Sequence, residues 1–151
     1  MPAPVTDLYK LLGKTKLVVL PEDYFLVRLP VETKPIPVEW QRPAATQFGA
    51  LIREPHEITL IVGRRKWLRM QNIFDDFDVS EPMKVITFDI KLSLNVYGYI
   101  AAISQVLAEA KISVVPMSSF SRDHILVSKK DLPRSVRLLR HFLQECRNAR
   151  S

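Results

Sequence analysis

A single stretch, from Gly98 to Val127, constrains the fold of this chain more than any other. It reads GYIAAISQVLAEAKISVVPMSSFSRDHILV, and its first half carries apolar residues at the three- and four-residue spacing of one helical face. A β-branched run begins at Ile112 and suits a buried strand better than a helix. Polar residues from Ser118 to Asp123 interrupt this run before it resumes at Ile125. The stretch therefore predicts a helix, a strand, a tight polar turn and a second strand.

The residues on either side extend this unit. Alternating side chains from Met83 to Leu92 predict a strand before the helix. After the second strand, Asp131 can N-cap a last helix that tolerates Pro133 in its first turn. A ferredoxin-like βαββαβ unit needs one more strand, and the segment Lys16–Leu20 could supply it. The apolar stripe of the last helix comprises Val136, Leu139, Phe142, Leu143 and Cys146.

The N-terminal half contains further short elements. A helical turn is expected over Asp7–Leu12, with Thr6 as its N-cap and Gly13 as its stop. Two apolar runs, Lys16–Leu20 and Tyr24–Leu29, flank a turn cluster and predict a pair of strands.

The next segments alternate between irregular and regular structure. Pro30–Pro43 holds four prolines and should be irregular, with Trp40 anchoring it in the core. A second hairpin is predicted from Phe48–Glu54 and Glu57–Gly63. The basic run RRKWLR that follows predicts a short helix or strand. The acidic stretch 71–82 is expected to be a flexible loop.

Length and composition bound the class of protein. A chain of 151 residues permits one domain or two small modules, and 47% hydrophobic with 25% charged residues is ordinary for a globular protein. No apolar run approaches 18 residues and the N-terminus lacks a signal-peptide pattern, so we expect no membrane span. The lone cysteine, Cys146, suits a core position, and a reducing, cytoplasmic location is the expectation.

Catalytic patterns are missing from the sequence. The four glycines never cluster into a phosphate loop, and no nucleophile elbow or metal-ligand spacing occurs. Glu54, His56 and Glu57 form a short acid–histidine run that is more typical of a solvated turn than of a metal site. We therefore expect no enzyme activity, no cofactor and no metal.

The motifs of the central stretch resemble the ACT-like domain of the CASTOR arginine sensors and of their small two-module relatives. The strong match covers residues 92–145, and residues 16–62 match more loosely. Lys111 stands where that family usually has Gly, directly after the helix. The matching residues are Gly98, Ile100, Ala101, Leu107, Ala108, Glu109, Ala110, Ile112, Ser113, Val114, Ser118, Ser119, Phe120, Asp123, His124, Leu126 and Val127.

This resemblance implies an α+β fold built from tandem ferredoxin-like modules that share strands. Each module would have the ACT-like βαββαβ order. The predicted boundaries are an N-terminal surface segment over 1–15, an N-terminal module over 16–82 with its acidic loop, and a C-terminal module over 83–151. Without the resemblance, the residue patterns predict only the α+β class.

The resemblance also implies a ligand site. Ser119 and Phe120 would line it, and Asp123 would pair with a ligand ammonium group. On the residues alone, the favoured interpretation is a plain hairpin turn whose Ser and Asp side chains bond local backbone. The loop before the helix has no carboxylate for a guanidinium, so a smaller amino acid, or no ligand, stays open beside arginine. The residues expected to hold a ligand carboxylate are Asn95, Val96, Tyr97 and Gly98.

The predicted function is therefore a non-enzymatic regulatory protein that senses an amino acid, with a homo-oligomer or a protein partner as its setting. The alternatives are nucleic-acid binding and a ligand-free assembly role. Residues 131–151 hold five Arg against two acidic residues, which gives the last helix a basic face. Among the expected central strands, ISVVPM and HILV have no aromatic residue and ITFDI has one, whereas RNA-recognition modules carry several, so nucleic acid is the less favoured partner.

Overall fold

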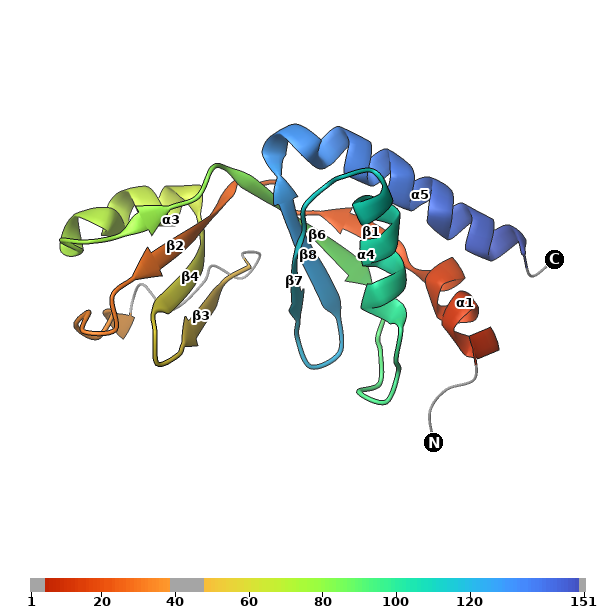
Figure 1. Cartoon of the computed structure of the whole chain (residues 1–151), viewed down its shortest axis with the longest axis horizontal. Helices are drawn as coiled ribbons and strands as arrows, with labels where there is room; N and C mark the ends of the chain where they lie inside the picture. The colour runs from red at the N-terminus through yellow and green to blue at the C-terminus, as the bar shows by residue number, and fades with distance from the viewer. Residues whose placement is uncertain (1–4, 39–47, 150–151) are drawn as a thin grey trace. The chain divides into compact units, whose positions relative to one another are not determined.

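The computed structural model describes residues 5–38 and 48–149 (Figure 1). The chain forms two compact units, and we call them the internal unit, Pro21–Met83, and the terminal unit, Met1–Leu20 with Lys84–Ser151. These units are not the predicted ranges, because the first twenty residues belong with the C-terminal part of the chain. The predicted surface segment 1–15 contains a helix whose Leu12 side chain is fully buried.

The terminal unit has four strands in the order β1-β6-β8-β7. Strand β1 lies antiparallel to β6, from the pair Lys16 and Asp89 to the pair Val19 and Ile86. Helix α5 packs against α1 and α4 (Figure 1). The elements of this unit are α1 (Val5–Lys14), β1 (Lys16–Val19), β6 (Met83–Asp89), α4 (Tyr99–Glu109), β7 (Val115–Ser118), β8 (Asp123–Ser128), η2 (Lys129–Asp131) and α5 (Leu132–Asn148).

Taken as β6-α4-β7-β8-α5-β1, these elements form a βαββαβ unit whose last strand comes first in the chain. The prediction that Lys16–Leu20 completes this sheet is confirmed. The prediction that the same segment pairs with Tyr24–Leu29 is wrong. The backbone of β1 is already paired with β6, and the N–H of Leu20 continues this ladder to the carbonyl of Val85 at 3.0 Å.

The internal unit repeats this strand order as β3-β4-β2-β5. The predicted second hairpin is confirmed by the β3–β4 pairing from Ala50 with Ile61 to Arg53 with Ile58. The acidic stretch 71–82 is not a flexible loop, because β5 within it pairs with β2. The elements are β2 (Tyr24–Leu29), β3 (Ala50–Arg53), β4 (Ile58–Gly63), α3 (Arg64–Met70), η1 (Gln71–Ile73) and β5 (Asp78–Val79).

Each unit has its own hydrophobic core. In the internal unit, the Trp67 ring stacks on Phe74 with centroids 5.9 Å apart and meets Phe77 edge-on at 5.0 Å. These two rings hold the acidic stretch in place, which explains why it is ordered despite its charge. Trp40, the predicted anchor, lies outside the described residues. The fully buried core of the terminal unit includes Leu12, Phe88, Ile103, Leu107, Leu139 and the predicted Cys146.

Two arginines of α5 donate hydrogen bonds to carbonyls at the C-terminal ends of other helices. Arg134 donates to the carbonyl of Ala110 at 2.9 Å, directly after α4. Arg147 donates through Nε to the carbonyl of Gly13 at 2.6 Å, in the last turn of α1. Arginine side chains satisfy carbonyls that a helix end leaves without partners. Part of the basic face of α5 is therefore structural.

The turn after α4 has a left-handed residue, as the resemblance implied. Lys111 has φ of 60°, and its N–H donates to the carbonyl of Ala108 at 2.9 Å. The N–H of Ile112 donates to Leu107 at 2.9 Å, which completes a Schellman motif. A lysine in this conformation is strained where glycine would not be.

The predicted N-caps are only partly right. Helix α1 begins at Val5, before Thr6, and includes Gly13. Asp131 stands at the N-cap position of α5 but makes no side-chain capping bond. Its carbonyl instead accepts a hydrogen bond from the Ser135 hydroxyl at 2.8 Å.

Candidate ligand-binding pocket

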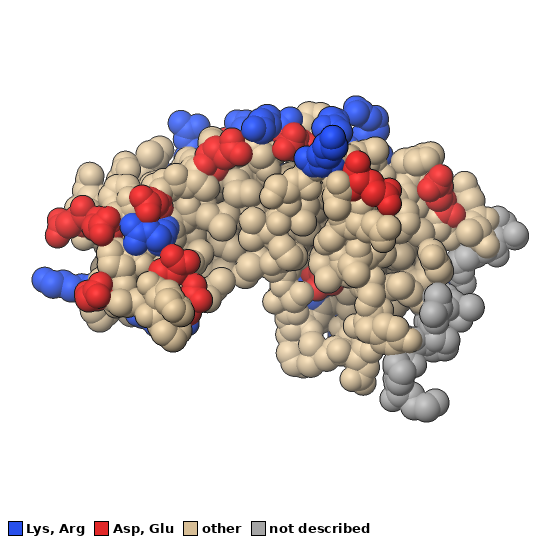
Figure 2. Space-filling model, viewed as in Figure 1, with Lys and Arg blue, Asp and Glu red and all other residues tan. Residues whose placement is uncertain are grey.

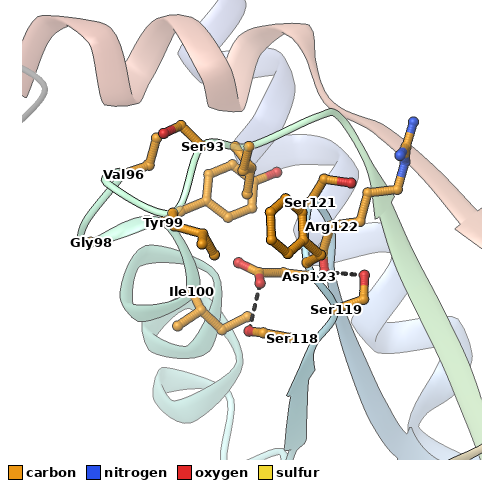
Figure 3. A pocket seen from close by; sticks show the side chains of 13 residues that line it. Ser93, Val96, Gly98, Tyr99, Ile100, Ser118, Ser119, Ser121, Arg122 and Asp123 are labelled. Atoms are coloured by element: carbon orange, nitrogen blue, oxygen red, sulfur yellow. Dashed lines mark hydrogen bonds between the residues drawn. The ribbon is translucent and has the colours of Figure 1, made fainter.

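The terminal unit has a pocket of about 200 Å³ between the start of α4 and the β7–β8 turn (Figure 3). Three chain segments form it: the loop after β6, the first residues of α4, and the polar turn. Its lining residues are Leu92, Ser93, Leu94, Val96, Gly98, Tyr99, Ile100, Ser118, Ser119, Phe120, Ser121, Arg122 and Asp123.

Local hydrogen bonds shape the turn. The backbone N–H of Ser119 donates to the carbonyl of Arg122 at 2.9 Å, and its hydroxyl donates to the same oxygen at 3.0 Å. The N–H of Leu92 donates to the carbonyl of Ser121 at 2.8 Å, which ties the loop after β6 to the turn. Ser119 therefore stabilises the turn through its side chain, as serine commonly does in turns. These bonds hold this wall of the pocket in place.

The opposite wall is the start of α4. Gly98 has φ of +85°, and a Cβ there would lie 3.3 Å from a methyl carbon of Leu8. Both the backbone angle and the close approach require glycine at this position. No side chain caps the helix, whose first N–H groups have no acceptor within the helix. This end of α4 is a donor surface suited to a carboxylate.

Asp123 supplies the negative charge of the pocket. Its carboxylate accepts a hydrogen bond from the Ser118 hydroxyl at 2.7 Å. The neighbouring Arg122 guanidinium points away from Asp123 (Figure 3) and pairs with Asp89 at 3.0 Å. No lysine or arginine among the described residues forms an ion pair with Asp123, which leaves its charge available to a cationic ligand group.

Buried polar side chains support both walls. Tyr99 is 2% exposed, and its hydroxyl lies 2.6 Å from Oγ1 of Thr15. Because Thr15 donates its own proton to the carbonyl of Leu11 at 2.8 Å, Tyr99 donates to Thr15. Burial raises the pKa of the Tyr99 phenol, which keeps this donor neutral.

His124 links the turn to the sheet. Its Nδ1 lies 2.9 Å from the Thr87 hydroxyl, and its Nε2 lies 3.4 Å from the Ser119 hydroxyl. Burial lowers the pKa of His124, and the nearby Arg122 lowers it further, while Asp123 raises it. The imidazole is therefore held toward its neutral form.

The structure brings five of the seven predicted site residues to one cavity. Val96, Gly98, Ser119, Phe120 and Asp123 line it. Phe120 is 82% exposed, which places its ring at the rim.

The other two predicted residues do not line the cavity. Asn95 donates its N–H to the Ser93 hydroxyl at 3.3 Å, and Tyr97 is 54% exposed. The sequence reasoning missed the other lining residues, among them Tyr99 and Ile100 at the start of α4. A residue in the first turn of a helix can line the site in front of that helix as well as the core beneath it.

The geometry bears on two other interpretations, nucleic-acid binding and a metal site. Phe88, the one aromatic residue of β6 and β8, is fully buried and cannot stack on a base. Acidic side chains lie among the basic ones on the face shown in Figure 2. Within residues 5–38 and 48–149, Glu54, His56 and Glu57 included, no three metal-binding side chains are grouped so that they could hold a metal ion. Within those same residues, every helix is too short or too polar to cross a membrane.

A family model matches part of this chain. Residues 78–141 match the family model of the ACT domain. The matched residues run from β5 into α5. No curated protein matches the chain.

Solved structures share the fold of nearly the whole chain. Protein VC0802 from Vibrio cholerae is 23% identical, with a TM-score of 0.71 over 94% of this chain and 100% of that chain. Protein Atu0741 from Agobacterium tumefaciens is also 23% identical, with a TM-score of 0.69 over 86% of this chain and 89% of its own. The ligand-free regulatory subunit of aspartate kinase from Thermus thermophilus is 10% identical, with a TM-score of 0.59 over 84% and 97%. The fold is thus the predicted α+β fold of ACT-type βαββαβ repeats.

Proposed function

We propose that this chain is a non-enzymatic regulatory protein that binds an amino acid in the pocket of the terminal unit. One observation carries the proposal: the Asp123 carboxylate and the uncapped start of α4 line the same cavity. An amino acid carries an ammonium group and a carboxylate on one carbon, and the two walls offer one partner for each. The similarity to a regulatory subunit of aspartate kinase agrees with such a role.

The lining favours a neutral amino acid over arginine. Asp123 is the one carboxylate of the pocket, so a ligand that uses it for the ammonium group leaves none for a guanidinium. Leu92, Val96 and Ile100 offer apolar contacts to a ligand side chain. The exposed ring of Phe120 would cover the bound ligand from the rim. Arginine sensing of the CASTOR type is thereby the less favoured form of this proposal.

The described pocket also favours binding over catalysis. Ser119 and His124 lie 3.4 Å apart, which suggests a nucleophile and a base. The Ser119 hydroxyl, however, donates to the Arg122 carbonyl at 3.0 Å, so its proton is not directed to the imidazole. The Ser119 hydroxyl thus acts as a structural donor in the turn.

A thermal-shift screen of the twenty amino acids tests the proposal. A ligand at about 100 times its Kd stabilises the folded state by about 2.7 kcal/mol, which raises the Tm measurably. The N-acetyl and amide derivatives of any hit are the matched controls, because each removes one of the two charges. We expect a neutral amino acid to raise the Tm and both derivatives to fail. The absence of any response, or equal responses to free and blocked forms, would exclude amino-acid binding at this site.

A further inference from the structure

A second cavity of the terminal unit lies between the start of β1 and the C-terminal half of α5. Its volume is about 350 Å³, within the range of small-molecule sites. Three cationic side chains line it: Lys16 from β1, and Arg140 and Arg147 from α5. We call it the basic cavity.

The charge of the basic cavity is unbalanced. No acidic side chain lines it. Within the described part of the chain, neither Lys16 nor Arg140 forms an ion pair. The nearest acid across the strand ladder, Asp89, is already engaged by Arg122 at 3.0 Å. Three cations that line one cavity repel one another, and a bound anion would relieve this repulsion.

Arg147 is held in position by protein groups. Its Nε donates to the carbonyl of Gly13 at 2.6 Å, and its terminal nitrogens approach the Gln144 side-chain oxygen at 2.8 Å and the Thr15 carbonyl at 3.5 Å. A guanidinium has five N–H donors, so two remain after these three contacts. A fixed guanidinium loses little side-chain entropy when it binds an anion.

The remaining lining defines the class of ligand. Leu17 and Leu143 add an apolar surface beside the three cations. A cavity of this volume holds more than a bare anion, and guanidinium groups match the oxygens of a phosphate. We propose that the basic cavity binds a small molecule that joins a phosphate group to an apolar part, such as a nucleoside phosphate. This inference is independent of the amino-acid site.

Titration calorimetry of the full chain with AMP, ATP, adenosine and inorganic phosphate, in about 0.15 M salt, tests the proposal. We expect AMP or ATP to bind, and both adenosine and inorganic phosphate to bind at least about tenfold more weakly, since each lacks one half of the ligand. Arg140→Gln should weaken nucleotide binding about tenfold or more, because it removes a cation that holds no other group.

Arg137→Gln is the matched control, since Arg137 lies on the exposed surface of the same helix but does not line the cavity. It should bind nucleotide as the wild type does. Equal losses from Arg137→Gln and Arg140→Gln would show a diffuse charge effect and overturn the proposal. So would the absence of nucleotide binding, or binding of a single-stranded RNA whose affinity rises with length and falls equally with either variant. Asp123→Asn should leave nucleotide binding unchanged, which separates this site from the pocket at α4.

Discussion

The two units of this protein share one strand order but differ in the described residues that follow the first strand of each repeat. In the terminal unit, the first two strands of the repeat, β6 and β7, are joined through α4, which starts at the left-handed Gly98. In the internal unit, the corresponding connection from β2 to β3 passes through Pro30, Pro35 and Pro37, and residues 31–37 form a turn and coil. Both units have the same strand order, and in the terminal unit the start of α4 forms one wall of the pocket.

The hairpin turns that follow differ in the same way. The β3–β4 turn holds exposed Glu54, Pro55 and His56, and its backbone bond runs from the N–H of Glu54 to the carbonyl of Glu57 at 3.1 Å. The β7–β8 turn instead places Asp123 in a cavity with the start of α4. The comparison teaches that the site depends on a few local residues rather than on the topology.

The largest expected effect concerns the strand order itself. A fragment of residues 83–151 lacks β1 and α1, so one side of β6 and the contact face of α5 are exposed. We expect it to aggregate or to lack a cooperative melting transition. A circular permutant that joins residues 83–148 through a short Gly/Ser linker to residues 5–20 restores every element of the terminal unit. It should melt cooperatively in circular dichroism, and a cooperatively folded 83–151 fragment would contradict the borrowed strand.

A smaller effect is expected from Thr15→Val. The substitution removes the acceptor of the buried Tyr99 hydroxyl, and an unsatisfied buried polar group costs about 1–3 kcal/mol. Thr15→Ser retains the hydroxyl and is the matched control. Urea unfolding should show the loss in the valine variant and most of the stability retained in the serine variant. Equal stability of the valine variant and the wild type would show that Tyr99 finds another partner.

Lys111→Gly should stabilise the protein. The left-handed backbone at this position costs a non-glycine residue about 1–2 kcal/mol, and the added freedom of glycine in the unfolded chain offsets part of the gain. We expect a net gain of about 0.5–1 kcal/mol in urea unfolding. Lys111→Ala retains the strain and should show no gain. A gain of the same size in the alanine variant would assign the effect to the lysine charge.

The smallest expected effect is a pH dependence from His124. Burial lowers its pKa in the folded state, so the unfolded chain binds the proton more tightly. Folding stability should therefore be fully present above the ordinary histidine pKa and should fall as the pH drops below about 6.5. The variant His124→Gln should flatten this fall in urea unfolding between pH 5 and 8. The exposed His141 is the control, and His141→Gln should retain the fall.

Local patterns predicted much of the terminal unit. The period of the Gly98–Val127 stretch predicted α4, β7, the turn and β8, because each element is long enough to show its own spacing. The missing strand at Lys16–Leu20 was found by counting the strands of the repeat. Its expected partner in Tyr24–Leu29 was wrong, because adjacency in sequence favours a hairpin and only long-range pairing assigns β1 to β6.

The pocket was less accessible to sequence reasoning. Gly98 and the serine-rich turn can be recognised in the sequence. Whether Tyr97 and Tyr99 are exposed or buried, however, depends on the residue at which α4 begins. The pairing of Arg122 with Asp89 joins residues 33 positions apart, and no local pattern encodes it. Likewise, the aromatic contacts of Trp67 order an acidic stretch whose composition is that of a loop.

Calorimetric titration of the wild type, Asp123→Asn and Asp76→Asn with the amino acid found by the thermal-shift screen tests the central claim most directly. Asp123→Asn keeps the shape and the acceptor for Ser118 but removes the charge, whereas Asp76→Asn removes an exposed carboxylate of the internal unit. A charge-assisted bond to an ammonium group contributes about 1.5–3 kcal/mol, so Asp123→Asn should bind about tenfold to a hundredfold more weakly. Asp76→Asn should bind as the wild type does. Equal affinities of the wild type and Asp123→Asn would remove the pocket at α4 from the binding site.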